Sequence, residues 1–412
     1  MEKPVPNIIG PLTYLALGME SLLPIIFWLC LVVVFYTYLG YGLLLYGIVL
    51  LKRLFVMKRE YAYEEQDLPE VTVLVAAYNE ADCIEDKIRN CLDFDYPSGK
   101  IHFLFITDGS DDGTPEQVAK YPQITLLHQP ERRGKIAATN RAMRYVKTPL
   151  VVFTDANTMV NRDAIRQMVR HFANPRVGVV AGEKRIAMKE KDDASGAGEG
   201  IYWKYESFLK RLDSELYSVV GAAGELFSIR TNLFEPVPED TIVEDFFMTL
   251  RIACKGYVIV YEPRAFAVES PSASVREELK RKIRIAAGGM QAIIRLAPLL
   301  NIFKYGVLSF QYISHRVLRW TLAPLCLPVL LAVNVALAFT GGGLFKTFLA
   351  AQLLFYSLAF TGFLLERRKI KIKIFFVPYY FFIMNYAVYA GFLRAIKGKQ
   401  SVLWEKAKRG QY

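Results

Sequence analysis

Four long apolar stretches lie near the two ends of the chain. Residues 22–51 carry no charged side chain, and residues 318–339, 344–365 and 374–396 are predominantly apolar. Because a helix of about 20 residues crosses a bilayer, each stretch is predicted to be a membrane span. The first stretch is too long for the core of a signal peptide and lacks a basic leader and a cleavage site, so we expect it to be retained.

Between these ends, short apolar runs alternate with amphipathic segments. The runs predict buried strands at residues 71–80, 101–110, 124–129, 149–158 and 177–183. The amphipathic segments predict helices at residues 81–92, 134–146, 162–172, 201–218 and 244–256. Strands that are apolar throughout and alternate with helices favour an α/β fold, with a mainly parallel sheet covered on both faces. Residues 192–200, rich in Gly and acidic side chains, are expected to be mobile.

The pattern divides the chain into four predicted parts. Residues 1–59 form a membrane anchor and basic hinge, and residues 60–272 form a cytoplasmic α/β domain. Residues 273–316 mix basic and apolar side chains, which is typical of helices that lie on a membrane surface. Residues 317–412 contain the C-terminal membrane segments and a basic tail.

The positions of the basic residues decide how the net charge of +11 is interpreted. Lys52 and Arg53 follow the first apolar stretch, and Arg367 and Arg368 lie between the third and fourth. Basic residues beside membrane spans mark the cytoplasmic side. No basic helix or aromatic RNA-binding motif accompanies the charge, so nucleic acid is not an expected partner.

The basic tail at residues 397–409 conflicts with this topology. If all three C-terminal stretches cross the membrane, the tail lies outside, against the charge rule. One stretch is then interfacial or re-entrant, or residues 293–313 add a crossing.

The cysteines and histidines give no sign of a metal centre. The five Cys residues form no CxxC pair, which fits a reduced cytoplasmic domain. The four His residues are scattered, without the spacing of a zinc site.

Three polar clusters follow the predicted strands: AAYNE, TDGSDDG and TDAN. Ligands of such sheets bind beyond the carboxyl ends of the strands, so these clusters are expected to meet at one edge. Asp108, Ser110, Asp112 and Gly113 also match the first half of a calcium loop. Calcium is disfavoured because the twelfth position is Ala119 and a strand precedes the loop. A simple turn is the alternative.

The remaining motifs each allow two interpretations. Asp155 and Asn157 of TDAN could face a divalent cation or form a turn. The RRGK sequence at 132–135 could bind an anion at a helix start or form a solvated basic turn. Asp245 could act as a general base, while acids at a helix start also favour the helix dipole. The RKIR sequence at 281–284 could clamp a diphosphate or face the membrane surface.

Taken in order, AYNE, DGSDDGT, RRGK, TDAN, GAAGELFSIR, VED and RKIR resemble the membrane-bound family 2 glycosyltransferases. These are the cellulose-synthase-like enzymes with a GT-A fold, related to hyaluronan, chitin and poly-N-acetylglucosamine synthases. The resemblance covers residues 71–295 and extends to the flanking apolar stretches.

The resemblance implies a role for each matching residue. It places Ala77, Tyr78 and Glu80 at the uridine, Asp108 at the base or ribose, and Lys135 beside the nucleotide. It implies that Asp155, with Asn157 in the place of a second acid, holds Mg²⁺ or Mn²⁺. It assigns Gly224 and Glu225 to the acceptor loop, Asp245 as catalytic base with Glu244 as its neighbour, and Arg281 and Arg284 to the diphosphate. Ile285 replaces the family's Trp, which puts processive synthesis in question.

The resemblance implies inverting transfer of a sugar from a nucleotide sugar, expected to be a UDP-sugar, at the cytoplasmic face of the membrane. The first hypothesis for the acceptor is a growing polysaccharide or glycan. The second is a single-sugar transfer to a polyprenyl-linked or ceramide-like lipid, which the small number of spans and Ile285 favour. A third hypothesis is a non-catalytic scaffold or transport subunit. A homo-oligomer, or association with other polysaccharide-synthesis proteins, is compatible with the first.

Overall fold

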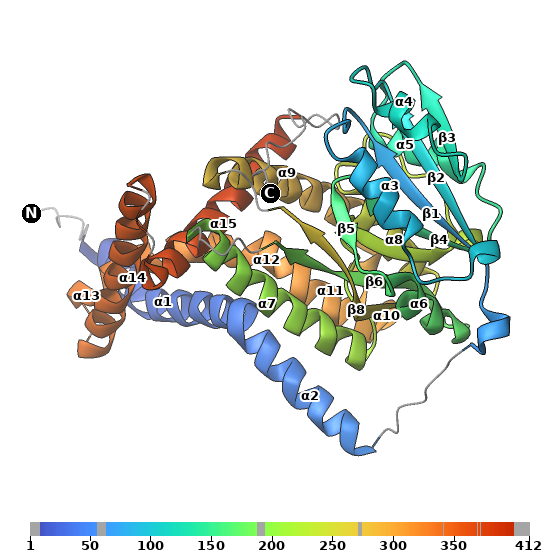
Figure 1. Cartoon of the computed structure of the whole chain (residues 1–412). Coiled ribbons are helices and arrows are strands. Elements are labelled where there is room, and N and C mark those ends of the chain that lie inside the picture. Colours follow the sequence, from blue (N-terminus) through green and yellow to red (C-terminus); the bar gives the residue numbers. More distant parts are fainter. Residues whose placement is uncertain are drawn as a thin grey trace, which may run out of the picture.

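The computed structural model describes residues 9–55, 63–187, 194–270, 274–340, 342–368, 370 and 372–398. Within these ranges it describes only the backbone of residues 9–21, 194–202 and 373. An α/β domain lies at one end of the molecule, and long apolar helices project from the other (Figure 1). The predicted domain boundaries at 59/60 and 272/273 lie outside the described residues.

One sheet of eight described strands forms the centre of the domain, in the order β3-β2-β1-β4-β7-β6-β8-β5. The strands are β1 (Val71–Ala77), β2 (Ile101–Asp108), β3 (Ile124–Gln129), β4 (Leu150–Asp155), β5 (Thr158–Val160), β6 (Val177–Ile186), β7 (Leu226–Arg230) and β8 (Val258–Glu269).

The sheet is mainly parallel, as predicted, and strands β7 and β5 are the exceptions. Strand β7 runs antiparallel to both β4 and β6, and β5 runs antiparallel to β8. The other described pairs are parallel. An apolar run reports burial on both faces of a sheet but carries no information on strand direction.

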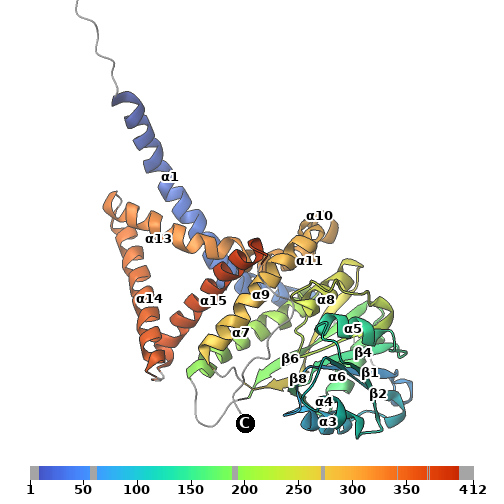
Figure 2. The ribbon, with the colours of Figure 1, turned by 90° about the horizontal axis from the view of Figure 1, so that it is seen from above.

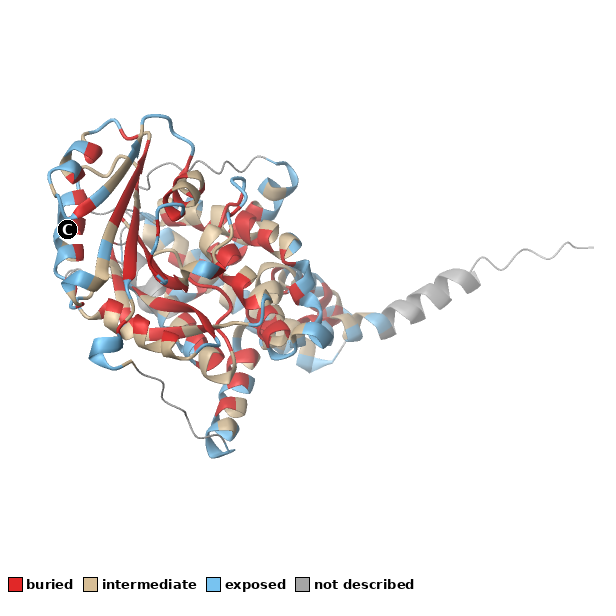
Figure 3. Cartoon of the chain, turned by 90° about the vertical axis from the view of Figure 1, so that its right-hand side faces the viewer, coloured by how far each residue is buried: buried red, intermediate tan, exposed pale blue. Residues whose placement is uncertain are grey.

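Helices cover both faces of the sheet, as predicted. Helices α3 (Ile84–Leu92), α4 (Thr114–Ala119) and α6 (Ala164–Val169) pack on one face, where Val73 and Val75 point. Helices α5 (Lys135–Met143) and α8 (Glu244–Cys254) pack on the other, with Leu74. The central strands, such as β1 and β4, are therefore buried along most of their length, whereas the edge strand β3 is mostly half-buried or exposed (Figure 3).

Four described segments are long and apolar enough to span a membrane, and they agree with the predicted stretches. They are Leu22–Phe55, Leu322–Thr340, Gly343–Arg367 and Ile374–Ile396. The first combines part of α1 (Ile9–Phe35), a π-helical turn (Tyr36–Gly40) and α2 (Tyr41–Phe55). The others belong to α13 (Leu322–Thr340), α14 (Gly343–Arg367) and α15 (Lys373–Ile396).

The additional crossing considered at residues 293–313 is absent from the described chain. This segment breaks into the end of α9 (Val275–Arg295), a 3₁₀ turn, α10 (Ile302–Tyr305) and α11 (Val307–Tyr312). Pro298 and Gly306, at a φ of 52°, interrupt a continuous helix.

Two long helices, α7 (Ala194–Leu216) and α9, lie between the sheet and α15 (Figure 2). Residues 194–200, which were expected to be mobile, form the first turns of α7, whereas residues 192–193 lie outside the described chain. Leu209 and Leu212 of α7 pack on Leu45 and Val49 of α2. Helices α7 and α9 thus join the α/β domain to the apolar helices.

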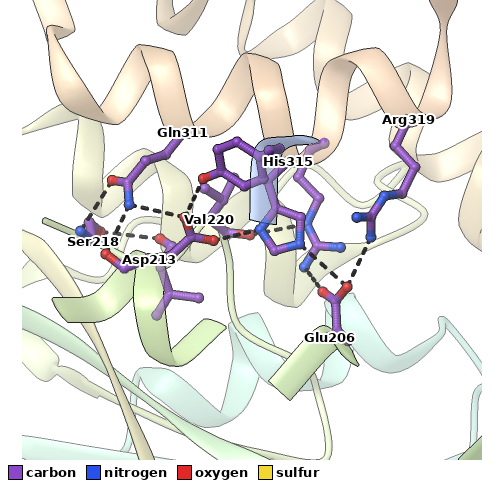
Figure 4. Close-up of polar contacts among 10 residues, drawn as sticks. Glu206, Asp213, Ser218, Val220, Gln311, His315 and Arg319 are labelled. Atoms are coloured by element: carbon purple, nitrogen blue, oxygen red, sulfur yellow. Dashed lines mark hydrogen bonds and ion pairs between the residues drawn. The ribbon is translucent and has the colours of Figure 1, made fainter. Parts of the chain in front are cut away.

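A buried polar network fastens α7 to the segment that follows α11 (Figure 4). The carboxylate of Asp213 is fully buried and accepts hydrogen bonds from the Tyr41 hydroxyl and, at 3.1 Å, from Gln311 Nε2. His315 Nδ1 lies 2.5 Å from the other oxygen of Asp213. One carboxylate therefore connects three elements that are distant in the sequence.

Asp213→Ala is expected to lower the free energy of unfolding by about 3–5 kcal/mol, because it leaves buried donors without an acceptor. Guanidinium denaturation of the detergent-solubilised protein, followed by tryptophan fluorescence, measures this change. Asp93→Ala is the control, since the Asp93 side chain is 68% exposed and its ion pair with Arg162 is long at 3.7 Å. It should cost less than about 1 kcal/mol. Equal effects of the two substitutions would contradict a structural role for Asp213.

Candidate active site

The carboxyl ends of β1, β2 and β4 lie side by side. In the sheet register Ala76 of β1 is opposite Asp155 of β4, and Ala77 is opposite Thr107, the residue before Asp108. The predicted meeting of the three polar clusters at one edge is therefore confirmed. The clusters meet because β1, β2 and β4 are neighbouring parallel strands whose carboxyl ends lie at the same edge of the sheet.

Reciprocal hydrogen bonds hold the first two of these loops together. Asn79, in the left-handed region at a φ of 53°, donates through Nδ2 to Asp111 Oδ1 at 2.8 Å and accepts from Asp111 N at 3.0 Å. Asp112 accepts from Ala81 N at 3.0 Å and from Thr114 N at 3.0 Å. These acids link two loops, which is more than the simple turn considered from the sequence.

Asp108 positions the RRGK segment. Its Oδ2 accepts the backbone N–H groups of Arg133 at 2.9 Å and Gly134 at 2.5 Å, in a buried position. Gly109 has a φ of 71°, and a Cβ there would come within 2.8 Å of the Arg132 Cα. The close approach of the two loops therefore requires glycine at this position.

The next residue, Lys135, lies between two carboxylates from different elements. Its Nζ is 2.8 Å from Asp155 Oδ1, at the end of β4, and 3.0 Å from Glu244 Oε1, at the start of α8. Burial by itself would lower the pKa of Lys135, but the two carboxylates more than offset it and raise the pKa. Burial likewise opposes ionisation of Glu244, and Lys135 overcomes this and lowers the Glu244 pKa.

Asp245 has a different environment although it adjoins Glu244. Its carboxylate forms no ion pair within 4.0 Å with any described residue. Burial, followed by the negative charge of Glu244, raises the pKa of Asp245 to about 7. Two neighbouring carboxyl groups with pKa values driven apart are the arrangement expected of a general base and its charged partner.

The GAAGE loop passes directly beneath Asp245. Gly221 has a φ of 84°, and a Cβ there would lie 2.4 Å from the Phe246 ring. A Cβ on Gly224 would lie 3.3 Å from Asp245 Oδ2 and 3.6 Å from Lys135 Nζ. Small residues in this loop thus keep space open in front of the carboxylate.

Glu225 ends the loop and is held by Lys184, a fully buried lysine that also pairs with Glu269. Burial opposes its ionisation, but the Lys184 ammonium more than compensates and holds the pKa of Glu225 well below its usual range. Glu225 is therefore an anion that is already neutralised.

Helix α9 brings two arginines over the same space. Arg281 donates two hydrogen bonds of 3.0 Å to Glu278. Burial lowers the pKa of Arg284, while the nearby Glu244 and Asp245 oppose this change. Both side chains line a partly open cavity, which favours the diphosphate interpretation of the RKIR motif over the membrane-surface one.

This cavity has a volume of about 230 Å³. It brings together eight of the predicted residues: Lys135, Asp155, Gly224, Glu225, Glu244, Asp245, Arg281 and Arg284. Ala77, Tyr78, Glu80, Asp108 and Asn157 are not among its lining residues, and the first four belong to the adjacent strand ends. The Tyr78 ring lies 3.8 Å beneath the Arg132 guanidinium.

A divalent cation fits the TDAN turn. Asn157 Oδ1 is buried and has no hydrogen-bond partner among the described residues, two positions after the carboxylate of Asp155. An unsatisfied buried amide oxygen next to a carboxylate is a suitable oxygen pair for Mg²⁺ or Mn²⁺. The oxygen atoms of this turn thus fit a divalent cation.

Several residues at this site were not predicted from the sequence. Lys87 is fully buried beneath the turn and donates to Thr154 Oγ1 at 2.9 Å and to the Thr158 carbonyl at 2.8 Å. The cavity is also lined by Trp203 and Lys210 of α7 and by Trp320 of α12 (Leu318–Trp320). The available signal for Lys87 was its place on an otherwise apolar helix face, where a lysine is unusual. Its hydrogen-bond partners could not be identified, because they lie about 70 residues away in the sequence.

Comparisons with known proteins agree with this geometry. A family model described as "Glycosyl transferase family 2" matches residues 72–237. A poly-beta-1,6-N-acetyl-D-glucosamine synthase of Staphylococcus aureus (strain MSSA476) is 30% identical over 237 residues, or 56% of this chain and 57% of that protein. The corresponding Staphylococcus epidermidis synthase is 26% identical over 272 residues, or 64% and 65% of the two chains. The match thus spans less than two thirds of these relatives.

A solved structure matches nearly the whole chain. A mannosyltransferase from Pyrobaculum calidifontis, in complex with GDP-Man and Mn²⁺, superposes with a TM-score of 0.68 at 26% identity. The superposition covers 92% of this chain and 99% of that protein. The chain thus combines a GT-A-like sheet, a segment that matches the glycosyl transferase family 2 model, and helices of membrane-spanning length, as expected of a membrane-bound glycosyltransferase.

Proposed function

We propose that this protein is an inverting glycosyltransferase that moves one sugar from a nucleotide sugar to an acceptor carried by a membrane lipid. The observation that carries the proposal is the position of Asp245. Its unpaired carboxylate faces a cavity with two kinds of wall: the charged sheet edge on one side, and Met384, Ala387 and Val388 of the apolar helix α15 on another. Such a cavity suits a water-soluble donor and a membrane-borne acceptor.

Asp245 is proposed to accept the proton of the attacking hydroxyl. A general base works best when its pKa lies near the operating pH, and the raised pKa of Asp245 meets this requirement. The deprotonated oxygen then displaces the nucleoside diphosphate at the anomeric carbon in a single step, which inverts the configuration there. No covalent intermediate is needed, so no nucleophilic side chain is assigned.

The cations of the cavity are proposed to stabilise the leaving diphosphate. Lys135 holds its position through Asp155 and Glu244, and Arg281 and Arg284 extend from α9. Guanidinium groups suit phosphate oxygens. This preference favours contact of Arg281 and Arg284 with the diphosphate of the donor over contact with the membrane surface. Asp155 and Asn157 would hold Mg²⁺ or Mn²⁺, which supplies positive charge to the departing diphosphate. The Mn²⁺ of the Pyrobaculum calidifontis structure supports this assignment.

For the donor we propose a UDP-sugar, with GDP-mannose as the second candidate. The first rests on the motif residues Ala77, Tyr78, Glu80 and Asp108. The second rests on the GDP-Man held by a neighbour that matches almost the whole chain. We also propose that the site faces the cytoplasm, because Lys52, Arg53 and Arg367 flank the apolar helices.

A growing polysaccharide is the second candidate acceptor. It is supported by the staphylococcal synthases, which match this chain over 56% to 64% of its length. A lipid-borne acceptor is preferred because α15 forms part of the cavity wall and Ile285 lines the cavity where the family has Trp.

Asp245→Asn is expected to reduce kcat for sugar transfer by about 10²- to 10⁴-fold, because the amide cannot accept the proton. Nucleotide affinity should be retained. The measurement is diphosphate release from UDP-GlcNAc and GDP-mannose in the presence of Mn²⁺. Asp240→Asn, at an exposed acid of the same loop paired with Arg295, is the matched control and should keep full activity. Wild-type rates in Asp245→Asn would remove the proposed base.

The pH profile should show the ionisation of Asp245. Below its pKa of about 7 the carboxyl is protonated and cannot act as a base, so log kcat/KM should rise with unit slope and level off above pH 7. Glu244→Gln removes the neighbouring negative charge and should move this acid limb to lower pH. If this low-pH rise of log kcat/KM stays in place or moves to higher pH in Glu244→Gln, the assignment of Asp245 as the base is contradicted.

Product length separates the two acceptors. Purified protein incubated with a radiolabelled nucleotide sugar and a membrane lipid extract should give a lipid product extended by one sugar. The products can be resolved by thin-layer chromatography and mass spectrometry. A ladder of increasing chain lengths would instead support the polysaccharide.

A further inference from the structure

Lys210 is a buried cation that lines the cavity. It lies on α7, and its side chain shares one helix face with Trp203 and Glu206, seven and four residues earlier. The residue is only 4% exposed. Its ammonium makes no hydrogen bond or ion pair with any residue that the structure describes, and its closest aromatic contacts are the rings of Trp203 at 5.8 Å and Tyr261 at 5.9 Å.

Other buried lysines of the domain differ from Lys210 in this respect. Lys87 is bonded to Thr154 and to the Thr158 carbonyl, Lys184 is bonded to two glutamates, and Lys282 lies 3.5 Å from Glu278. Burial without a partner destabilises a charged group, and it accordingly lowers the pKa of Lys210. An anionic ligand would remove this cost.

The nearest acid on the same helix is already neutralised. Glu206 is 2.6 Å from Arg316, 3.1 Å from Arg319 and 3.4 Å from His315. Glu183 and Glu225 also lie near Lys210, but neither forms an ion pair with it: Glu183 accepts a hydrogen bond from Ser207, and Glu225 pairs with Lys184. Lys210 is therefore not required to balance Glu206, and the cavity has a cation available for a ligand.

We propose that Lys210 forms a second anion subsite, which binds the phosphate of the lipid-carried acceptor. This inference rests on the proposed function and specifies its acceptor as a phosphate-linked lipid rather than a ceramide-like one. The Trp203 ring beside the ammonium provides a flat apolar surface for the first part of the lipid chain or for the sugar.

The position of Lys210 favours the acceptor over the donor as the source of the phosphate. The cations assigned to the donor, Lys135 and Arg284, belong to the sheet edge and to α9, close to Asp155 and Glu244. Lys210 instead lies on α7, which packs against α15. Since Ala387 and Val388 of α15 line the same cavity, a phosphate at Lys210 would have an apolar wall beside it for its lipid chain.

Binding to the full-length protein in detergent micelles tests this assignment. The probes are farnesyl phosphate, farnesol, inorganic phosphate, UDP and GDP, followed by intrinsic tryptophan fluorescence. Farnesyl phosphate should bind the wild type about 10- to 100-fold more tightly than farnesol, the range of a charge-assisted contact in a buried site. Lys210→Met should abolish this difference and leave UDP and GDP affinity unchanged.

Lys204→Met is the matched control, because Lys204 is an exposed lysine on the same helix. It should bind all probes as the wild type does. A thermal melt of Lys210→Met establishes that this variant is folded, and Met is expected to be tolerated at a buried position.

Three results would overturn the inference. The first is equal affinity of the wild type for farnesyl phosphate and farnesol. The second is loss of UDP or GDP affinity in Lys210→Met with farnesyl phosphate unaffected, which would place the donor at Lys210. The third is inorganic phosphate binding as tightly as farnesyl phosphate, which would identify a site for free phosphate. None of these binding measurements requires sugar transfer. A failure of the Lys210 assignment can therefore be distinguished from a failure of the proposed transferase activity.

Discussion

The ion pairs of Lys135 are the contacts on which the candidate active site depends. One ammonium joins Asp155, at the end of a central strand, to Glu244, at the start of α8. This contact pairs two of the three neighbouring carboxylates with one ammonium and leaves Asp245 without an ion pair among the described residues. Because the third carboxyl is buried beside a fixed negative charge, its pKa rises into the range of a general base.

The sequence was sufficient to predict the strand ends and most of the residues that meet there. Asp155 and Asp108 follow apolar runs, and the edge of a sheet brings such positions together whatever the loops contain. The direction of β7 was not predictable, since an apolar strand in the middle of a sheet is buried in either orientation. The buried lysines were also missed, because Lys184 and Lys210 acquire their significance only from residues on distant elements.

The apolar helices contribute to the site as well as to membrane attachment. Helices α7 and α9 lie between the sheet and α15, so side chains from all three enclose one cavity. The buried network around Asp213 fixes α7 to α2 and to the segment after α11, and thereby holds this wall in place. The proposed donor edge lies on the sheet and the proposed acceptor wall on helices of membrane-spanning length, an arrangement that suits chemistry at a membrane surface.

Infrared spectroscopy of the carboxyl groups tests the central claim, that Asp245 is a carboxyl of raised pKa, most directly. Difference spectra between the wild type and Asp245→Asn, recorded during a pH titration of the detergent-solubilised protein, isolate the ionisation of this one group. The geometry predicts a protonated-carboxyl band that disappears with a midpoint near pH 7. A midpoint near the ordinary aspartate value of 3.8 would show that Asp245 is ionised throughout and would contradict the claim.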